Sequence, residues 1–313
     1  MFKLTSKVRE ILNQPDQVIP YLRQQARTSV YLIESHQYKK TVYTLLNELT
    51  SVDNFIHSDW HSIIKEVNGT KMVLDLRDRG INRDLLLDGI REEEETREFE
   101  NQLEQLKTEY HKVQVFDIGA NIGYYVLLEA SVLGNEHRIY AFEPHPTNVA
   151  QLRKSIKLNN FDNFVQIEQC AIGAETGTVD LAISPYSNTH RINGIKEGSS
   201  TTIEVPIKPI DHVLSEKGIP KADCLLFRID VEGFEHRVFA GMDKVLSSNQ
   251  DIFIFVEVHS SVPQDEISKM MNVLLDCGFE LVYTGERTID SLGDLVTSSS
   301  FHVMAKRTSQ MNV

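Results

Sequence analysis

Ionisable side chains stand at the ends of four short apolar runs in this sequence. Asp117 lies near the end of the first run, and Glu143 and Asp230 directly follow the second and third. Glu257 and His259 close the fourth. Such runs are typical of parallel strands buried on both faces, and ligands bind these sheets at the carboxyl ends of the strands. Because several carboxylates at one edge are costly unless paired or used, the pattern predicts a binding or catalytic site there.

The first two runs are joined in the order of a nucleotide-binding unit. Val113 to Ile118 is rich in β-forming residues, Tyr124 to Leu133 is helical in composition, and Arg138 to Phe142 is a second apolar strand. Strand, glycine turn, helix and strand followed by an acid is the layout of a nucleotide-binding βαβ unit. The sequence therefore predicts a nucleotide site at the turn.

The turn itself contains Gly119, Asn121 and Gly123. Glycine lets backbone approach a ligand closely, and the following helix begins with free N–H groups. A dinucleotide fingerprint has a second glycine that clears a pyrophosphate, and Asn121 fills that position here. The turn favours a ligand without phosphates, such as S-adenosylmethionine. Glu143 can then accept both hydroxyl protons of the ribose.

Four segments, VFDIGANIGYY, AFEPHP, RIDVEGFEHRVFAG and FVEVH, resemble in order the FkbM-type family of S-adenosylmethionine-dependent O-methyltransferases. The likeness runs from about Lys71 to about Lys306. It implies a class I, Rossmann-like α/β fold: a doubly wound, mostly parallel sheet of seven strands, with an antiparallel last strand beside the fifth. It also implies methylation of a hydroxyl, often on a sugar or polyketide, without identifying the acceptor.

The cofactor residues come from the βαβ unit and the strand after it. Asp117 is assigned to the turn and the methionine end of the cofactor. The third strand is predicted over 164–171, and its end lies where related enzymes hold adenine. The predicted cofactor-binding residues are Asp117, Gly119, Asn121, Gly123, Glu143 and Ala171.

The remaining strand-end residues are assigned to catalysis: Asp230, Glu257 and His259. Methyl transfer requires that a hydroxyl be aligned and lose its proton. His259 is the candidate base because a neutral histidine is available near neutral pH, and Asp230 would orient the hydroxyl. Alternatively, two carboxylates, with Glu232 among the candidates, hold Mg²⁺, which lowers the pKa of the bound hydroxyl. The sequence leaves both arrangements open.

Three parts are predicted along the chain: a helical extension at residues 1–60, a hairpin and helix at 61–112, and a methyltransferase domain at 113–313. The hairpin turns at Asn68-Gly69, the strongest short hairpin signal. Within the domain, strands are predicted at Gly177 to Ser184, Thr201 to Ile207, Leu225 to Asp230 and Asp251 to His259. One helix is predicted from Gly233, with Val238, Met242 and Val245 facing inward. The polar loop between the first two of these strands carries three candidate substrate contacts: Asn188, His190 and Arg191.

The net charge of −13 over 313 residues argues against nonspecific binding to nucleic acid. Residues 1–50 differ, with seven Lys/Arg against four Asp/Glu. This basic segment is compatible with a solvated surface or with weak docking to an anionic membrane. The oligomeric state stays open.

Cys170, Cys224 and Cys277 are far apart and set in apolar contexts, so neither a disulfide framework nor a zinc site is predicted. No stretch reaches the length of a membrane span, and the N-terminus lacks the apolar core of a signal peptide. A cytoplasmic location is therefore expected.

Three functions are compatible with these observations. The leading hypothesis is an S-adenosylmethionine-dependent O-methyltransferase acting on a sugar, a glycan or another hydroxylated small molecule. A nucleotide-cofactor oxidoreductase is the second, and Asn121 between the glycines argues against it. A non-catalytic binding module with a methyltransferase fold is the third, and the retained Asp117, Glu143 and Asp230 argue against it.

Overall fold

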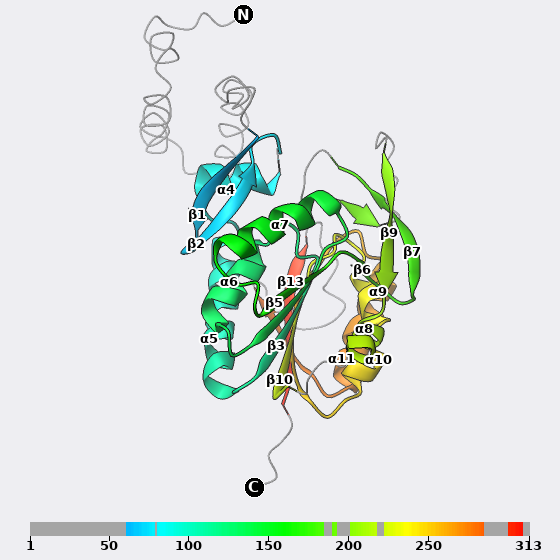
Figure 1. Ribbon diagram of the computed structural model, residues 1–313. Coiled ribbons are helices and arrows are strands. Elements are labelled where there is room, and N and C mark those ends of the chain that lie inside the picture. Colours follow the sequence, from blue (N-terminus) through cyan, green and yellow to red (C-terminus); the bar gives the residue numbers. More distant parts are fainter. Residues whose placement is uncertain are drawn as a thin grey trace, which may run out of the picture. The chain divides into compact units, whose positions relative to one another are not determined.

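The computed structural model describes residues 61–78, 80–184, 190–192, 201–217, 222–284 and 300–308. Ser62–Val313 forms one unit, built around a central sheet with helices on both faces (Figure 1). The helices expected in residues 1–60 lie outside the described residues, as do Asn188 and the basic segment at 1–50. Within the described ranges, no helix is both long enough and apolar enough to cross a bilayer.

The central sheet has the strand order β12-β13-β11-β10-β3-β4-β5 in the described part of the chain. β13 runs antiparallel to both of its neighbours, and the other pairings are parallel. This confirms the class I, Rossmann-like fold and the antiparallel last strand. The strands are β3 (Val113–Ile118), β4 (Arg138–Phe142), β5 (Val165–Glu168), β10 (Cys224–Ile229), β11 (Asp251–Val258), β12 (Glu280–Thr284) and β13 (Phe301–Arg307).

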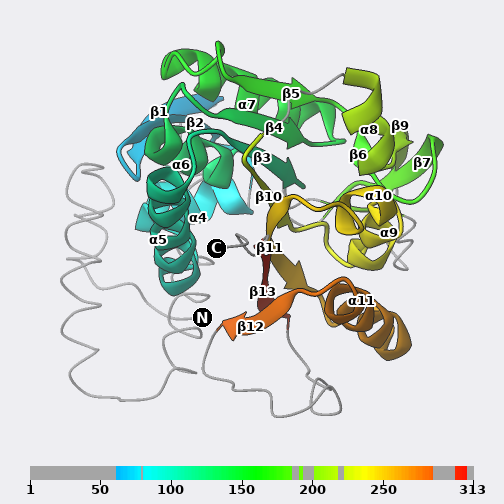
Figure 2. The ribbon, with the colours of Figure 1, turned by 90° about the horizontal axis from the view of Figure 1, so that it is seen from below.

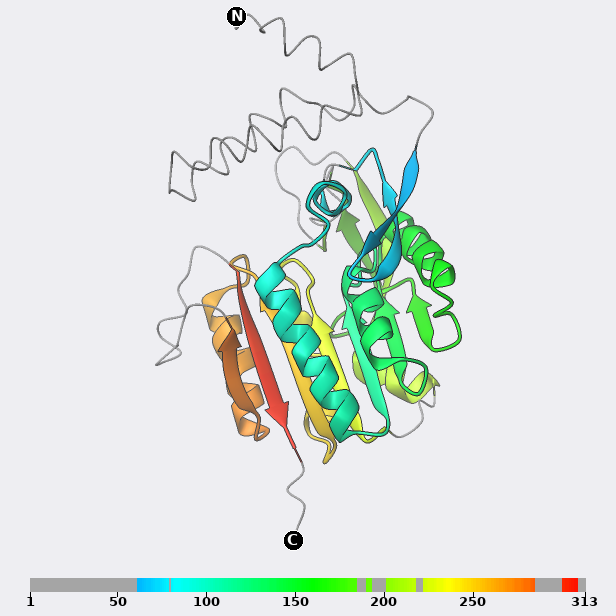
Figure 3. The same ribbon diagram turned by 90° about the vertical axis from the view of Figure 1, so that its left-hand side faces the viewer.

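Two helical layers cover this sheet. One contains α5 (Glu93–Glu109), α6 (Tyr124–Leu133) and α7 (Pro146–Leu158), whose apolar side chains share one core. The other layer contains α8 (Ile210–Lys217), α9 (Glu235–Phe239), α10 (Asp243–Leu246) and α11 (Gln264–Asp276), as Figure 2 shows. Figure 3 shows α5 lying on its face of the sheet, roughly in line with the strands.

Alternation along β3 assigns its side chains to these two layers. Val113 and Val115 pack in the core under α5 and α6, whereas Phe116 and Ile118 pack in the core on the other face. Asp117 shares the parity of Val115, so its side chain points toward the α6 layer. Full burial of a Val, Ile or Phe side chain contributes about 1.5–3 kcal/mol, which makes this register difficult to shift.

The predicted hairpin is confirmed as β1 (Ser62–Val67) and β2 (Thr70–Asp75). Asn68 and Gly69 both have positive φ, at 48° and 73°, as a tight hairpin turn requires. β2 is held to α7, because the backbone N–H of Val73 donates to Ser155 Oγ at 3.0 Å. The helix that follows, α4 (Ile81–Asp88), and α8 were not predicted from the sequence.

The single strand predicted over 164–171 is wrong, because the chain there divides between two sheets. β5 ends at Glu168, whose carbonyl accepts the backbone N–H of Glu143 at 3.1 Å. The chain then turns, and Ala171 pairs with Ile207 in a second sheet. That sheet has the order β6-β9-β7-β8 and confirms the expected strand pair; its strands are β6 (Ala171–Ile172), β7 (Gly177–Ala182), β8 (Arg191–Ile192) and β9 (Thr202–Lys208).

The single helix predicted from Gly233 is also divided, into α9 and α10. At the break, Gly241 lies against the chain at Gly173, and a Cβ on Gly241 would stand 2.2 Å from the Gly173 carbonyl oxygen. The carboxylate of Asp211 then accepts the backbone N–H groups that begin α10. The expected apolar residues remain buried in spite of the break: Val238, Met242 and Val245.

We predict that Gly119→Ala strongly destabilises the protein. Gly119 has φ of +89°, and a Cβ there would stand 1.8 Å from the backbone oxygen of Asp230. We expect a loss of about 2 kcal/mol or more in the free energy of unfolding, measured by denaturant titration. Gly134→Ala is the matched control, because its φ is +78° and no atom lies within 4 Å of the added Cβ. Equal losses in the two variants would show that the contact with β10 has no effect on stability.

Candidate functional site

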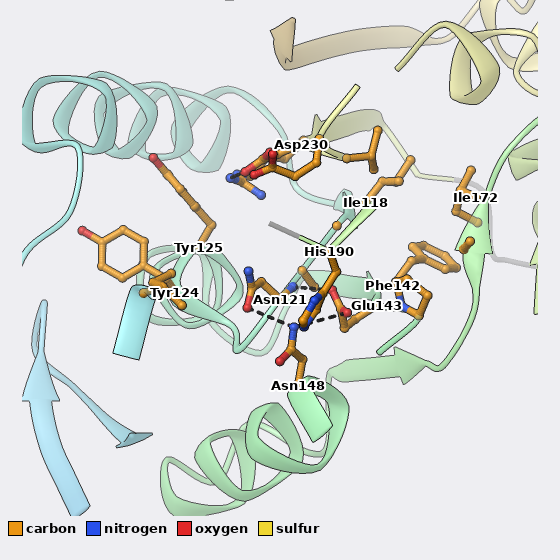
Figure 4. A pocket seen from close by; sticks show the side chains of 18 of the residues that line it. Ile118, Asn121, Tyr124, Tyr125, Phe142, Glu143, Asn148, Ile172, His190 and Asp230 are labelled. Carbon is orange, nitrogen blue, oxygen red and sulfur yellow. Dashed lines mark hydrogen bonds and ion pairs between the residues drawn. The ribbon is translucent and has the colours of Figure 1, made fainter. Parts of the chain in front are cut away.

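A pocket opens at the carboxyl ends of β3, β4 and β10. Figure 4 shows Phe142 and Ile172 on one side, Tyr124 and Tyr125 on the other, and Glu143 between them. The apolar end is completed by Cys170, Ala171, Leu181 and Ile192, and the charged end by Arg91, Glu92, Arg228, Asp230 and Glu232. The pocket therefore changes from apolar to charged along its length.

The turn after β3 is tied to the end of β4. The backbone N–H groups of Gly119 and Ala120 donate to the carbonyl oxygen of Phe142, at 2.9 and 3.0 Å. Asn121 takes the left-handed conformation, with φ of +50°, and its backbone N–H donates to Glu143 Oε2 at 2.9 Å. A short polar residue in the middle of the turn thus connects the turn to the acid.

Glu143 is buried, yet its carboxyl lines the pocket. Oε1 accepts the backbone N–H of His145 at 2.8 Å, and Asn148 Nδ2 approaches the same oxygen at 3.4 Å. Burial raises the pKa of Glu143 to about 7, although the N–H donors of His145 and Asn121 favour the charged form. This carboxyl is therefore balanced between its two forms near neutral pH.

The predicted cofactor residues occupy two different positions. Gly119, Asn121, Glu143 and Ala171 line the pocket. Asp117 is fully buried beneath it, and its Oδ1 lies 3.3 Å from Arg228 Nη1. Gly123 does not line the pocket either. It precedes α6 with φ of +94°, and a Cβ there would stand 2.3 Å from the Leu152 side chain.

Arg228, which was given no role in the predictions from the sequence, links buried Asp117 to half-buried Asp230. Its Nη2 lies 3.0 Å from Asp230 Oδ2, and its guanidinium stands 3.8 Å from the centre of the Tyr125 ring. Burial and the charge of Asp117 raise the pKa of neighbouring Glu129 well above its usual value. The sequence contains a feature that could have identified Arg228: it is the one arginine inside an otherwise apolar strand. A charge buried in this way needs an acidic partner.

The structure brings Asp230, Glu257 and His259 together. His259 Nε2 lies 3.6 Å from Glu257 Oε1 and from Glu232 Oε2, and 4.0 Å from Asp230 Oδ1. Glu235, which was not predicted from the sequence, is fully buried, and its Oε1 lies 2.8 Å from His259 Nδ1. The same oxygen accepts the backbone N–H of Gly233, so Glu235 sets the orientation of the imidazole ring.

The carboxylates around His259 decide its charge. Burial disfavours a charged ring, but the hydrogen bond to Glu235 and the charges of Glu235, Asp230 and Glu257 raise the pKa of His259 to about 9. The ring is therefore an imidazolium at neutral pH, unlike the neutral base expected from the sequence. Burial alone would raise the pKa of Asp230, but Arg228 and His259 hold it below its ordinary value.

The same cluster has the donor set of a cation site. Asp230, Glu232 and His259 each offer a ligand atom, and these atoms lie within 4.8 Å of one another. Arg191 Nη2 competes for Glu232 Oε2, at 3.4 Å. Mg²⁺ prefers oxygen ligands, whereas a set that includes an imidazole also suits transition metals.

Two of the three predicted loop contacts lie in the described part of the chain, and His190 is the one of these two that lines the pocket. His190 lines it with its ring centroid 4.2 Å from that of His145. Its Nδ1 accepts the backbone N–H of Ser184 at 3.0 Å, and burial lowers its pKa to about 4. Arg191 pairs with Glu232, which lines the charged end of the pocket.

A family model described as the methyltransferase FkbM domain matches residues 117–281. The chain belongs to this family. It is also similar to the 31-O-demethyl-FK506 methyltransferase FkbM of Streptomyces tacrolimicus, with 29% identity over 158 residues. That match covers 41% of this chain and 59% of the relative, so the chain spans less than two thirds of the relative's length.

Comparison with solved structures found similarities at low identity. One is the precorrin-6y C5,15-methyltransferase of Geobacter metallireducens, at 14% identity and a TM-score of 0.38, covering 68% of this chain and 88% of that chain. Another is TYW2 of M. jannaschii in complex with AdoMet, at 16% identity and a TM-score of 0.39, covering 80% and 87%.

We predict that Glu143→Gln removes a pH dependence of stability. The pKa of Glu143 is raised from 4.5 to about 7 in the folded protein, so its contribution is present below about pH 4.5 and is lost as pH rises through about 7. The free energy of unfolding of the wild type should fall over this window relative to that of the variant. Denaturant titration at several pH values measures the difference. Parallel curves for the two proteins would contradict the raised pKa.

Proposed function

We propose that this protein transfers a methyl group from S-adenosylmethionine to a hydroxyl group of a small molecule, with a sugar or glycan as the favoured acceptor. The observation that carries the proposal is Glu143, a buried carboxyl at the end of β4 that lines the pocket between its apolar and charged ends. A ribose offers two hydroxyl donors to this carboxyl, whereas a phosphate at that place would be repelled. Membership of the FkbM family supports the same activity.

The two ends of the pocket match the two ends of this cofactor. Phe142, Ile172 and Leu181 offer an apolar surface suited to adenine, and the residues of the charged end suit a sulfonium and an amino-acid tail. When bound, the cofactor supplies an electrophilic methyl group attached to a good leaving group. The protein's own task is to hold the acceptor hydroxyl in line and to take its proton.

Asp230, Glu257 and His259 are the proposed acceptor residues. Asp230 is ionised beside Arg228 and is suited to accept a hydrogen bond from the hydroxyl. His259 is the proposed base, and its ring must first lose the proton that it holds at neutral pH. The ring loses this proton to solvent as the pH approaches its pKa of about 9, because neighbouring Glu232, with a pKa raised by burial to about 7, is the weaker base. The rate of transfer should therefore rise with pH.

The acceptor class rests on two supports. The ionisable groups around His259 are mainly carboxylates, which accept hydrogen bonds from sugar hydroxyl groups. The Streptomyces tacrolimicus relative is named for a 31-O-demethyl substrate, which supports transfer to oxygen.

A divalent cation is the alternative means of activating the hydroxyl. Asp230, Glu232 and His259 would hold it, and it would lower the pKa of the bound hydroxyl. A cation and a protonated His259 cannot share this cluster, so the two arrangements predict different effects of a chelator.

The test is a mass-spectrometric search for a gain of one methyl group in extracts incubated with the protein and S-adenosylmethionine carrying a deuterated methyl. We expect labelled products that are O-methylated. Once an acceptor is known, His259→Ala should bind S-adenosylhomocysteine normally by calorimetry and lose about 10²–10⁴ in rate, the contribution of a general base.

Three results would change this account. Failure to bind S-adenosylhomocysteine, or equal stabilisation by NAD, would remove the methyltransferase proposal. Near-full turnover by His259→Ala without metal dependence would remove His259 as the base. Loss of activity in EDTA with recovery in Mg²⁺ or Mn²⁺ would replace the histidine mechanism by the cation mechanism.

A further inference from the structure

The charged end of the pocket contains a guanidinium that the proposed mechanism does not use. Arg91 lies in the link between α4 and α5, outside the range 117–281 that the family model matches. Its side chain is 22% exposed and lines the pocket. The family match therefore assigns no role to Arg91, and a role has to be inferred from the residues that surround it.

The backbone around Arg91 is held firmly against the start of α6. The carbonyl oxygen of Arg91 accepts hydrogen bonds from Tyr124 OH at 3.1 Å and from Thr96 Oγ1 at 2.8 Å. Glu92 has φ of +47°, and its carboxylate accepts the hydroxyl of Tyr125 at 3.1 Å. Tyr124 and Tyr125 begin α6, the helix that follows the glycine turn, and both line the pocket. The link between α4 and α5 is therefore attached directly to the pocket.

The guanidinium itself is only partly used by the protein. Arg91 Nε donates to Glu92 Oε1 at 2.7 Å. Among the described residues, none accepts a hydrogen bond from its two terminal nitrogen atoms. A planar guanidinium with open N–H groups is suited to a carboxylate or a phosphate, which it binds through two parallel hydrogen bonds.

The order of groups along the pocket selects between these anions. If the ribose lies at Glu143 and adenine at the apolar side, the amino-acid tail of the cofactor extends toward Tyr124 and Tyr125, on the opposite side in Figure 4. That tail carries one ammonium and one carboxylate. Glu92 is an acid suited to the ammonium, and Arg91 is the cation left for the carboxylate.

We propose that Arg91 binds the carboxylate of the methionine tail, so that the link between α4 and α5 completes the cofactor site. This inference rests on the proposed function, because it takes S-adenosylmethionine as the ligand. It assigns a binding role to a segment outside the matched domain, and it excludes Arg91 from recognition of the acceptor.

Two ligands that differ in the tail test the proposal. S-adenosylhomocysteine has the amino-acid tail, and methylthioadenosine has the same nucleoside and sulfur without it. In Arg91→Ala, calorimetry should show a dissociation constant for S-adenosylhomocysteine weakened about 10- to 100-fold, the range for hydrogen bonds between charged groups. The dissociation constant for methylthioadenosine should not change. Arg91→Lys, which keeps the charge without the planar fork, should fall between the wild type and Arg91→Ala.

Arg77→Ala is the matched control, because Arg77 is 67% exposed and pairs with Asp75 away from the pocket. Binding of methylthioadenosine reports an intact pocket in each variant. If Arg91→Ala and Arg91→Lys lose both ligands equally, or keep the wild-type preference for S-adenosylhomocysteine, the proposal is wrong. If the wild type binds neither ligand, the proposed function fails instead, so the two failures are distinguishable.

Discussion

The charged end of the site depends on one buried guanidinium. Arg228 stands between Asp117 on β3 and Asp230 at the end of β10, at 3.3 and 3.0 Å, and it lies over the ring of Tyr125 from α6. The pairing of Asp117 with Arg228 in the sheet register places these charges side by side. Without this cation the fully buried carboxylate of Asp117 would lie near that of Asp230 with no opposite charge between them, which is unfavourable. Arg228 therefore joins the two central strands and keeps Asp230 ionised for its place in the pocket.

Glu143 has the corresponding role at the centre of the pocket. The turn after β3 donates to its carboxyl through Asn121, and the start of α7 donates through His145. The same acid thus fixes the shape of the turn and lines the space that a ribose would fill. From this acid, apolar side chains extend in one direction and charged side chains in the other, which is the order of groups in S-adenosylmethionine. The cofactor proposal follows from this order more than from any one contact.

Local patterns predicted the parts of the fold that local forces determine. The strands and helix over 113–142 were found with their observed bounds, because hydrophobic runs and a glycine turn define them. The strand expected at 164–171 failed because pairing with distant β9 redirects Ala171. The expectation that residues at the carboxyl ends of parallel strands lie together was correct for Asp230, Glu257 and His259. It did not place Asp117 in the pocket, because side chains alternate along β3 and that of Asp117 points to the α6 layer. The contacts of Arg91 with Tyr124, of Arg228 with Asp117 and of Glu235 with His259 could not be predicted, since each joins residues far apart in the sequence.

The measurement that tests the role of Arg228 most directly is a double-mutant cycle on unfolding. Arg228→Met keeps the apolar stem but leaves Asp117 buried without its cation, so it should lower the free energy of unfolding by about 3–5 kcal/mol. Adding Asp117→Asn removes the unpaired charge and should restore part of that loss, with a coupling free energy above about 1 kcal/mol. Additive effects of the two substitutions would contradict the account, because Arg228 would then not be the charge on which Asp117 and the site depend.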